Sequence, residues 1–527
     1  MISRAILLHF PVITDIIKPM NTVTIFPVIT GLLLILFFAY YIKVVQPRTG
    51  TVQWISDVMG KGELSLINKR FPMEIKDFLP LAIITSAFLI LAVVNLGNTD
   101  TVDVIREIHE PSANRTRMSN LYFDEIYFVR TAAEHIQSLH PYESSHPPLG
   151  KEIIAASILI AGESPFGWRL LGAVFGVITI VVMYIFAKNM FGKTLVAAGA
   201  ALLSGFDFMR FVQTRLATID SYAVLFILLA FFFMYRYITV DADAPFRKSV
   251  APLALSGIFF GLSFAVKWVG FYAGAGLLVI YIIRLYQLIV HYNEQKKSGF
   301  GIYLTKTLLF SMLFFVIIPV LVYYLSYIPY GAARGMTLEQ GMLWNPEFFD
   351  IVWKNQVSMF SYHSKLVAEH PFSSTWWQWI LNIRPILYVN SASGELRSTF
   401  GSFGNPVVWW AGFVAIVIMA VRVFTHNDGK AWFILIGYAL QLLPWVAVTR
   451  IVFIYHYFPS SLFMILALAH IFNTMIERGE QLGKQMVYGF TALTGIIFAM
   501  FYPAISGMYM PRWYYSNLIK WFDSWPF

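Results

Sequence analysis

The sequence predicts an all-α fold that crosses a membrane many times, and its composition and apolar pattern lead to this class. Hydrophobic residues make up 58% of the 527 residues and charged residues only 13%, whereas a soluble domain is about 45–50% apolar and about 25% charged. Apolar runs recur at the length of roughly 20 residues that a helix needs to cross a bilayer core. This composition excludes a soluble enzyme, a disordered chain and a coiled coil.

The apolar runs predict about twelve membrane-spanning helices, judged by the length that each must have. They lie near residues 25–44, 79–97, 167–187, 194–210, 216–235, 250–266, 268–289, 307–328, 406–424, 430–448, 451–472 and 486–505. The run at 152–162 is shorter, which predicts part of a loop or a re-entrant helix. Residues 1–20 lack a small-residue cleavage site and are more typical of an interfacial helix than of a signal peptide.

Two long polar segments, 98–166 and 329–405, lie on the same side if the helices alternate in direction. The opposite face, with the shorter loops, carries 19 of the 38 basic residues but only 10 of the 29 acidic ones, so the net charge of +9 falls there. Basic loops stay in the cytoplasm. We therefore expect a multi-pass protein of the cell membrane with both long loops outside the cytoplasm, and no nucleic-acid partner.

The order of spans and loops divides the chain into four parts. Residues 1–78 hold the interfacial segment, a first spanning helix and a basic cytoplasmic loop. Residues 79–328 form a transmembrane module that contains the first long loop. The second long loop, 329–405, precedes a C-terminal four-helix module with a tail, 406–527.

The first long loop contains two neighbouring carboxylates in an aromatic and apolar run, Leu121-Tyr-Phe-Asp-Glu-Ile-Tyr-Phe128. Carboxylates in low-dielectric surroundings become more basic, because burial disfavours the charged form. Asp124 and Glu125 are therefore candidates for catalysis. An ordinary interfacial helix with two outward-facing acids explains the same pattern.

A second candidate element in this loop is the turn His146-Pro-Pro-Leu-Gly-Lys151. Two prolines fix φ and remove two backbone donors, and Gly150 permits an unusual backbone angle. The turn places His146 and Lys151 at the start of the next segment, where both are candidates for substrate binding. The alternative is a membrane-entry turn with a snorkelling lysine.

Five basic residues lie at the predicted outer ends of helices: Arg169, Arg210, Arg215, Lys267 and Arg450. Burying charge in a membrane is costly, so such residues usually face a polar cavity. A phosphate group is a suitable partner, especially for the planar donor fork of arginine. Snorkelling, or pairing with the nearby Asp207 and Asp220, is the alternative.

Metal and nucleotide sites are not indicated. The chain has no cysteine, which excludes thiolate ligands and a cysteine nucleophile. His363 and His370 have no third ligand at a recognised spacing. Asp241-Ala-Asp243 matches a weak metal-binding pattern of nucleotide-sugar enzymes, but it falls in a short cytoplasmic loop. No Walker-type phosphate loop is present, which argues against ATP-driven transport. We expect neither a metal nor a cofactor.

Taken in order, the motifs resemble the protein O-mannosyltransferase family. The resemblance runs from about residue 79 to 505 and is carried by Phe123-Asp-Glu125, His146-Pro-Pro-Leu-Gly-Lys151, Trp168-Arg-Leu-Leu171, Lys267-Trp-Val-Gly270, Tyr362-His-Ser364, His370-Pro-Phe-Ser-Ser374, Gly404-Asn-Pro-Val-Val-Trp-Trp410 and Tyr455-His-Tyr-Phe-Pro459. It implies the GT-C fold, with the active site outside the cytoplasm. It also implies transfer of mannose from a polyprenyl phosphate to Ser or Thr hydroxyls of proteins, with inversion.

The same resemblance suggests roles for individual residues. It implies that Asp124 is the catalytic aspartate, Glu125 its essential neighbour and Arg169 the essential arginine after the first loop. Where the family commonly has an aspartate two residues before His-Pro-Pro, this chain has Ser144, with Glu143 beside it. The segment 329–405 is too short for the β-trefoil domain of eukaryotic members, so the resemblance is to a prokaryotic type. The helix near 25–44 is additional to the usual set.

Physical chemistry agrees with these roles. A Ser or Thr hydroxyl needs a positioned base, for which Asp124 is the candidate. A lipid phosphate leaves already charged, so it needs positive charge rather than an acid. Arg169 is the first candidate for this, with Arg215, Lys267 and Lys151 behind it. Neighbouring residues on a helix point about 100° apart, so Glu125 more plausibly orients the acceptor or a basic residue.

Two other functions fit parts of the pattern. One is a GT-C transferase that uses another lipid-linked sugar, or a lipid or glycan acceptor. The other is a transporter or lipid flippase, a class that often has inverted repeats and charges at the bilayer midplane. The charged residues of this chain gather at one surface and in two outer loops, which favours an enzyme acting at the bilayer surface.

The predicted orientation can be tested by cysteine labelling, because the native chain has no cysteine. Single cysteines within 100–160 or 335–400 should react with an impermeant thiol reagent in intact cells. Cysteines within 55–75 or 241–248 should react only after the cells are opened. Labelling of a cysteine at 241–248 in intact cells, with none at 100–160, would reverse the orientation.

Overall fold

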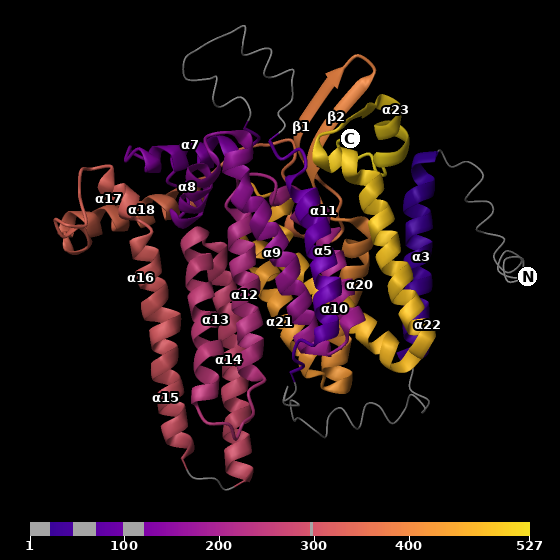
Figure 1. Ribbon diagram of the computed structural model, residues 1–527, viewed down its shortest axis with the longest axis horizontal. Helices are drawn as coiled ribbons and strands as arrows, with labels where there is room; N and C mark the ends of the chain where they lie inside the picture. The colour runs from indigo at the N-terminus through magenta and orange to yellow at the C-terminus, as the bar shows by residue number, and fades with distance from the viewer. Residues whose placement is uncertain (1–21, 46–69, 98–120, 296–298) are drawn as a thin grey trace, which may run out of the picture.

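The computed structural model describes residues 22–45, 70–97, 121–295 and 299–527. Long helices run roughly side by side, and the short helices and a small sheet gather at one end of the bundle (Figure 1). Within the described ranges, ten helical segments are long and apolar enough to cross a membrane. The protein is therefore a multi-pass membrane protein.

The predicted apolar stretches all coincide with helices. The long helices are α3 (Thr22–Val45), α5 (Ile75–Val93), α9 (Pro165–Phe191), α12 (Asp220–Ile238), α13 (Arg247–Val266), α14 (Val269–Glu294), α15 (Phe300–Met312) continuing into α16 (Ile318–Leu325), α20 (Pro406–His426), α21 (Gly429–Leu442) and α22 (Phe458–Ser506). The last covers two predicted spans, separated by non-helical backbone at Glu480. The stretch predicted at 194–210 forms a shorter helix, α10 (Thr194–Gly205).

Short elements cover one end of the bundle. They are α7 (Glu125–Ile136), α8 (Leu149–Ala161), α11 (Phe208–Gln213), α17 (Ile328–Ala332), α18 (Pro346–Lys365), α19 (Trp376–Ile380) and α23 (Arg512–Tyr514). The run at 152–162, predicted as loop or re-entrant helix, is therefore a regular helix, α8. Its inner face is buried at Ile154 and Ile158, whereas Leu159 and Ile160 are exposed. The interfacial helix predicted for residues 1–20 lies outside the described residues.

A small antiparallel sheet departs from the all-helical expectation for the second long loop. Strands β1 (Ile386–Ser393) and β2 (Leu396–Ser402) form a hairpin, and β3 (Tyr509–Pro511) from the C-terminal tail pairs with the start of β2. The connecting turn contains Gly394 at φ 59°, a backbone angle that glycine adopts without strain. The sheet joins the second loop to the tail, although these segments are far apart in sequence.

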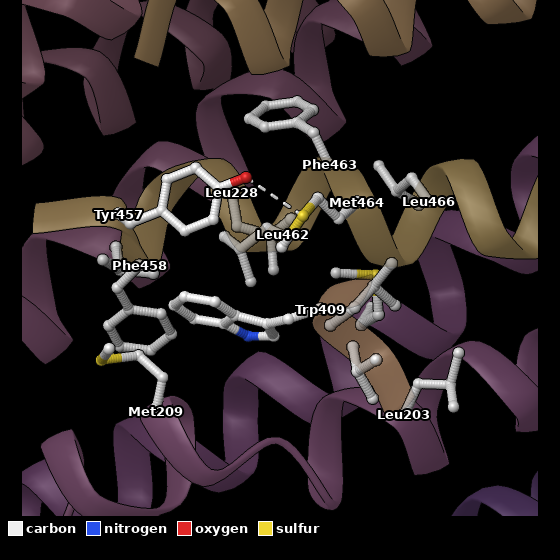
Figure 2. Close-up of a cluster of buried hydrophobic side chains, with 14 of the residues drawn as sticks. Leu203, Met209, Leu228, Trp409, Tyr457, Phe458, Leu462, Phe463, Met464 and Leu466 are labelled. Atoms are coloured by element: carbon white, nitrogen blue, oxygen red, sulfur yellow. Dashed lines mark hydrogen bonds between the residues drawn. The ribbon is translucent and has the colours of Figure 1, made fainter. Parts of the chain in front are cut away.

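The core of the bundle lies around Trp409 of α20, which has no exposed surface. Figure 2 shows side chains packed around it, among them Leu203, Met209, Leu228, Tyr457, Phe458, Leu462 and Met464. Its indole N–H donates to Asp207 Oδ1 at 2.9 Å, so the one polar atom of the ring is satisfied. Helices from both transmembrane modules therefore share one core.

The tryptophans of the second loop differ from one another in burial. Trp379 is fully buried, stacks near His456 at 5.9 Å between ring centroids and lies 5.8 Å from Trp445. Trp377 remains exposed. The contacts of Trp379 therefore fix the second loop onto the start of α22 and the end of α21. As a result, both long loops lie over the same end of the bundle.

Candidate active site

The start of α7 presents two carboxylates in different directions. Phe123, immediately before them, has φ 54°, which is unusual for a bulky residue. Its ring lies 5.3 to 6.3 Å from four others, those of Tyr388, His370, Phe453 and Tyr455. This packing holds the backbone turn that separates Asp124 from Glu125.

Glu125 is fully buried and its carboxylate is completely hydrogen-bonded. Arg169 of α9 binds it with two parallel bonds, Nε to Oε1 at 2.8 Å and Nη2 to Oε2 at 2.7 Å. Backbone N–H groups of Ala217 and Tyr122 donate one further bond to each oxygen, at 2.7 and 2.9 Å. Paired, bidentate charges of this kind are among the strongest hydrogen-bonded contacts in proteins. Glu125 therefore fastens the start of α7 to α9.

Asp124 has a different environment. The only hydrogen bond found for its carboxylate within the described ranges is one from the Tyr455 hydroxyl, at 3.4 Å. The pKa of Asp124 is raised to about 7. Burial is the largest cause, the Lys267 ammonium opposes the rise, and the Asp220 and Glu143 carboxylates add to it. A carboxylate with this pKa is far more basic than an ordinary aspartate at neutral pH, and it keeps free lone pairs for a proton.

Tyr455 links this carboxylate to Lys267, because it contacts both side chains. Its ammonium pairs with Asp220 Oδ1 at 2.8 Å and lies 5.5 Å from the centre of the Tyr455 ring. Lys267 follows α13 and Asp220 begins α12, so the ends of two neighbouring helices provide this pair. Pairing with Asp220, the alternative to a phosphate-facing role for this basic residue, is present here.

The turn around His146 is organised by Glu143. The Lys151 ammonium donates to Glu143 Oε2 at 2.6 Å and to the Glu143 and His146 carbonyl oxygens. His146 Nδ1 lies 3.1 Å from Glu143 Oε1. Burial by itself would raise the pKa of Glu143. Lys151 and His146 outweigh this effect and hold the pKa well below its usual value. Lys151 is thus a fully buried residue that fixes the turn.

The imidazole of His146, in contrast, faces a cavity of about 550 Å³. We call this the Lys267 cavity; its basic and imidazole residues are His146, Lys267, His363, Lys365 and Arg450, and no carboxylate among the described residues lines it. Burial lowers the pKa of His363 to about 4, so its ring is neutral at pH 7. Arg450 has no carboxylate partner among the described residues. The cavity therefore carries uncompensated positive charge.

Of the other three predicted arginines, Arg210 donates to the Ser204 and Gly205 carbonyl oxygens, and Arg169 and Arg215 line a second cavity. Arg215 donates from Nη1 to the carbonyl oxygens of Leu91, Ala92 and Val94 at 2.8 to 2.9 Å, at the end of α5. This second cavity has a volume of about 350 Å³. We call this the Arg215 cavity; it shares no lining residue with the Lys267 cavity.

The structure thus groups the predicted residues into three sets: Asp124 with Lys267 and His146 near the Lys267 cavity, Glu125 with Arg169, and Lys151 in the Glu143 turn. Tyr455, His363 and Glu143 were not predicted as site residues, although all three occur in or beside the quoted motifs. Only motif membership signalled Tyr455 and His363, because their partners Asp124 and Ser145 are distant in sequence. The partners of the Glu143 carboxylate lie within eight residues of it. Within the described ranges no cluster of three or more His, Asp or Glu side chains has a metal-binding arrangement.

A partly buried carboxylate with a raised pKa and a cavity lined by cationic residues lie at the same end of the helical bundle. Together with the matches that follow, they identify a membrane glycosyltransferase with the GT-C fold. Residues 157–329 match the family model for dolichyl-phosphate-mannose-protein mannosyltransferase. Residues 348–525 match the model for the C-terminal four-helix region of protein O-mannosyltransferase. The chain belongs to the protein O-mannosyltransferase family.

Relatives and a solved structure agree with this assignment. The polyprenol-phosphate-mannose–protein mannosyltransferase of Corynebacterium glutamicum is 27% identical over 76% of this chain and 88% of its own length. The Mycobacterium tuberculosis protein of the same name is 26% identical over 72% of this chain and 80% of its own. The fold is similar to the S. cerevisiae Pmt1-Pmt2 complex bound to the sugar donor, with a TM-score of 0.72 at 15% identity, covering 86% of this chain and 93% of that one.

The Glu125–Arg169 pair should contribute strongly to stability. Removing one partner of a buried pair leaves an uncompensated charge, at a cost of about 3–5 kcal/mol. Glu125→Gln and Arg169→Gln should therefore each lower the unfolding temperature in detergent, and the double variant should cost less than the sum of the two. Asp350→Asn, which breaks an exposed pair with Lys354, is the control and should change stability by about 1 kcal/mol at most. Equal unfolding temperatures for wild type and Glu125→Gln would contradict this role.

Proposed function

We propose that this protein transfers mannose from a polyprenyl phosphate carrier to Ser or Thr hydroxyls of proteins. The reaction takes place on the extracytoplasmic side of the cell membrane and inverts the anomeric centre. The observation that carries the proposal is Asp124, a partly buried carboxylate with a pKa of about 7, linked through Tyr455 to the Lys267 cavity. The names of the relatives supply the sugar and the class of carrier.

Asp124 acts as the general base. An acceptor hydroxyl next to its carboxylate gives up its proton as the oxygen attacks the sugar C1. A base whose pKa is close to the working pH combines a large ionised fraction with good basicity. The Tyr455 hydroxyl holds one oxygen of Asp124 and leaves the other for the acceptor.

The leaving phosphate is placed in the Lys267 cavity. The C1–O bond breaks toward the phosphate, which departs with its negative charge and needs no proton. Arg450 and Lys267 lie where this charge develops, and fixed positive charges in a partly buried site stabilise it well. Trp268 and Tyr272 also line the cavity, which offers an apolar surface to the first part of the lipid.

Inversion follows from the roles of the two carboxylates. A double displacement with retention needs a carboxylate that is free to attack C1. Both oxygens of Glu125 already accept two hydrogen bonds each, so it is not such a nucleophile. With Asp124 occupied as the base, a single displacement by the hydroxyl remains.

The decisive experiment is transfer by the purified protein in detergent. Radiolabelled mannose on a polyprenyl phosphate should appear on a Ser- or Thr-containing peptide without a sealed membrane, which a transporter cannot achieve. Label transferred only from a different lipid-linked sugar, or only to a lipid or glycan, would replace the proposed substrates. No transfer from any lipid-linked sugar would refute the proposal.

Asp124→Asn should reduce turnover by roughly 10²–10⁴-fold, the usual contribution of a general base. The amide keeps the shape of the side chain, so expression and donor binding should change little. Turnover is measured under donor and acceptor saturation, and donor binding by equilibrium titration. Asp243→Asn, in a loop at the opposite end of the bundle, is the matched control and should leave turnover unchanged. Near wild-type turnover in Asp124→Asn would require another base.

The pKa of Asp124 also predicts a pH profile. The folded-state pKa is raised to about 7, so the ionised, active form is lost as the pH falls below this value. The ratio kcat/KM should rise about tenfold per pH unit below 7 and level off above it. His363, with a pKa of about 4, does not titrate in this range. A profile that is flat between pH 5.5 and 7.5, with chemistry rate-limiting, would contradict the assignment.

A further inference from the structure

The Arg215 cavity has a charge that the proposed reaction does not use. Of its two cations, Arg169 is neutralised by Glu125. Arg215 is only 5% exposed and has no carboxylate partner among the described residues. No acidic side chain of the described residues lines the cavity. One buried positive charge is therefore left uncompensated, which is costly unless an anion is supplied.

Hydrogen-bond donors remain available at the same place. Arg215 uses Nη1 for the three carbonyl oxygens of α5, but its Nε is buried without a partner among the described residues. The hydroxyl of Ser506, at the end of α22, is also buried without a described partner. Both residues line the cavity. Buried donors are nearly always satisfied in folded proteins, so these two indicate an acceptor group from outside the described chain.

The position of the cavity favours a lipid as the source of that acceptor. The carbonyl oxygens that hold Arg215 belong to the last residues of α5, a helix long and apolar enough to span the membrane. Its side chains Leu89, Ile90 and Val94 are exposed, as expected for a surface in contact with acyl chains. Cationic residues at the end of a spanning helix lie at the depth of the headgroups, where they bind lipid phosphates.

We propose that the Arg215 cavity binds the phosphate of an anionic membrane lipid, at a site separate from that of the sugar donor. The phosphate oxygens accept from Arg215 Nε and Ser506 Oγ, and the acyl chains lie along the exposed face of α5. Arginine suits this role because its planar fork matches phosphate oxygens. The bound lipid neutralises Arg215 next to the Glu125–Arg169 pair, in the wall of the active site.

The test is lipid binding to the purified full chain. Phosphatidylglycerol is titrated against excess phosphatidylcholine and followed by native mass spectrometry and unfolding temperature. Arg215→Gln should weaken phosphatidylglycerol binding at least tenfold. Because this variant also removes bonds to α5, Val389→Phe provides a second test: it fills the cavity from β1 and leaves Arg215 in place. Val417→Phe, at an exposed position of α20, is the matched control and should bind as the wild type does.

Further titrations distinguish the possible sources of the bound phosphate group. Polyprenyl phosphate that competes with phosphatidylglycerol in the wild type, but not in Val389→Phe, would support the site and extend it to the spent carrier. If inorganic phosphate raised the unfolding temperature as much as phosphatidylglycerol does, the assignment to a lipid would be overturned. Equal phosphatidylglycerol binding in wild type, Arg215→Gln and Val389→Phe would overturn the site itself. None of these results depends on sugar transfer, so failure here is separate from failure of the proposed reaction.

Discussion

The buried ion pair between Glu125 and Arg169 is the contact on which the candidate site depends. It joins the first residue of α7 to α9, and the Ala217 N–H adds the segment before α12. Displacing Glu125 breaks four hydrogen bonds in a region with no exposed surface. Because Asp124 precedes Glu125 directly, its position follows from this pair and from the packing of Phe123. Rigid placement of this kind is what a catalytic carboxylate needs.

The two neighbouring carboxylates differ in how their burial is compensated. Glu125 has a guanidinium and two backbone donors to offset its lost hydration. Asp124 has one hydroxyl and a more distant ammonium, so burial dominates and raises its pKa to about 7. Two adjacent acids of similar chemistry thus differ in their surroundings, and this difference underlies the roles proposed for them, positioning for Glu125 and general base for Asp124.

The cationic side chains at this end of the bundle also differ in their surroundings. Lys151 is fully buried and fixes the turn at Glu143, and Arg169 fixes α7. Lys267 and Arg450 line one cavity and Arg215 another. Lys267 pairs with Asp220 and also lines a cavity, whereas Arg450 and Arg215 line cavities without a carboxylate partner among the described residues. The two cavities share no lining residue, so the proposed phosphate site and the proposed lipid site lie apart.

The sequence alone determined the membrane fold, because apolar runs of spanning length leave little choice of structure in a bilayer. It also determined Asp124 and Glu125 as candidates, since two acids in an aromatic run are rare. It did not predict the β1–β2 hairpin, the burial of Trp379 or the helix α8, which depend on partners far along the chain. Only the tertiary structure showed that Arg169 and Lys267 have different surroundings. Positive charges at helix ends look alike in the sequence, and they differ in which carboxylate, carbonyl or cavity they face.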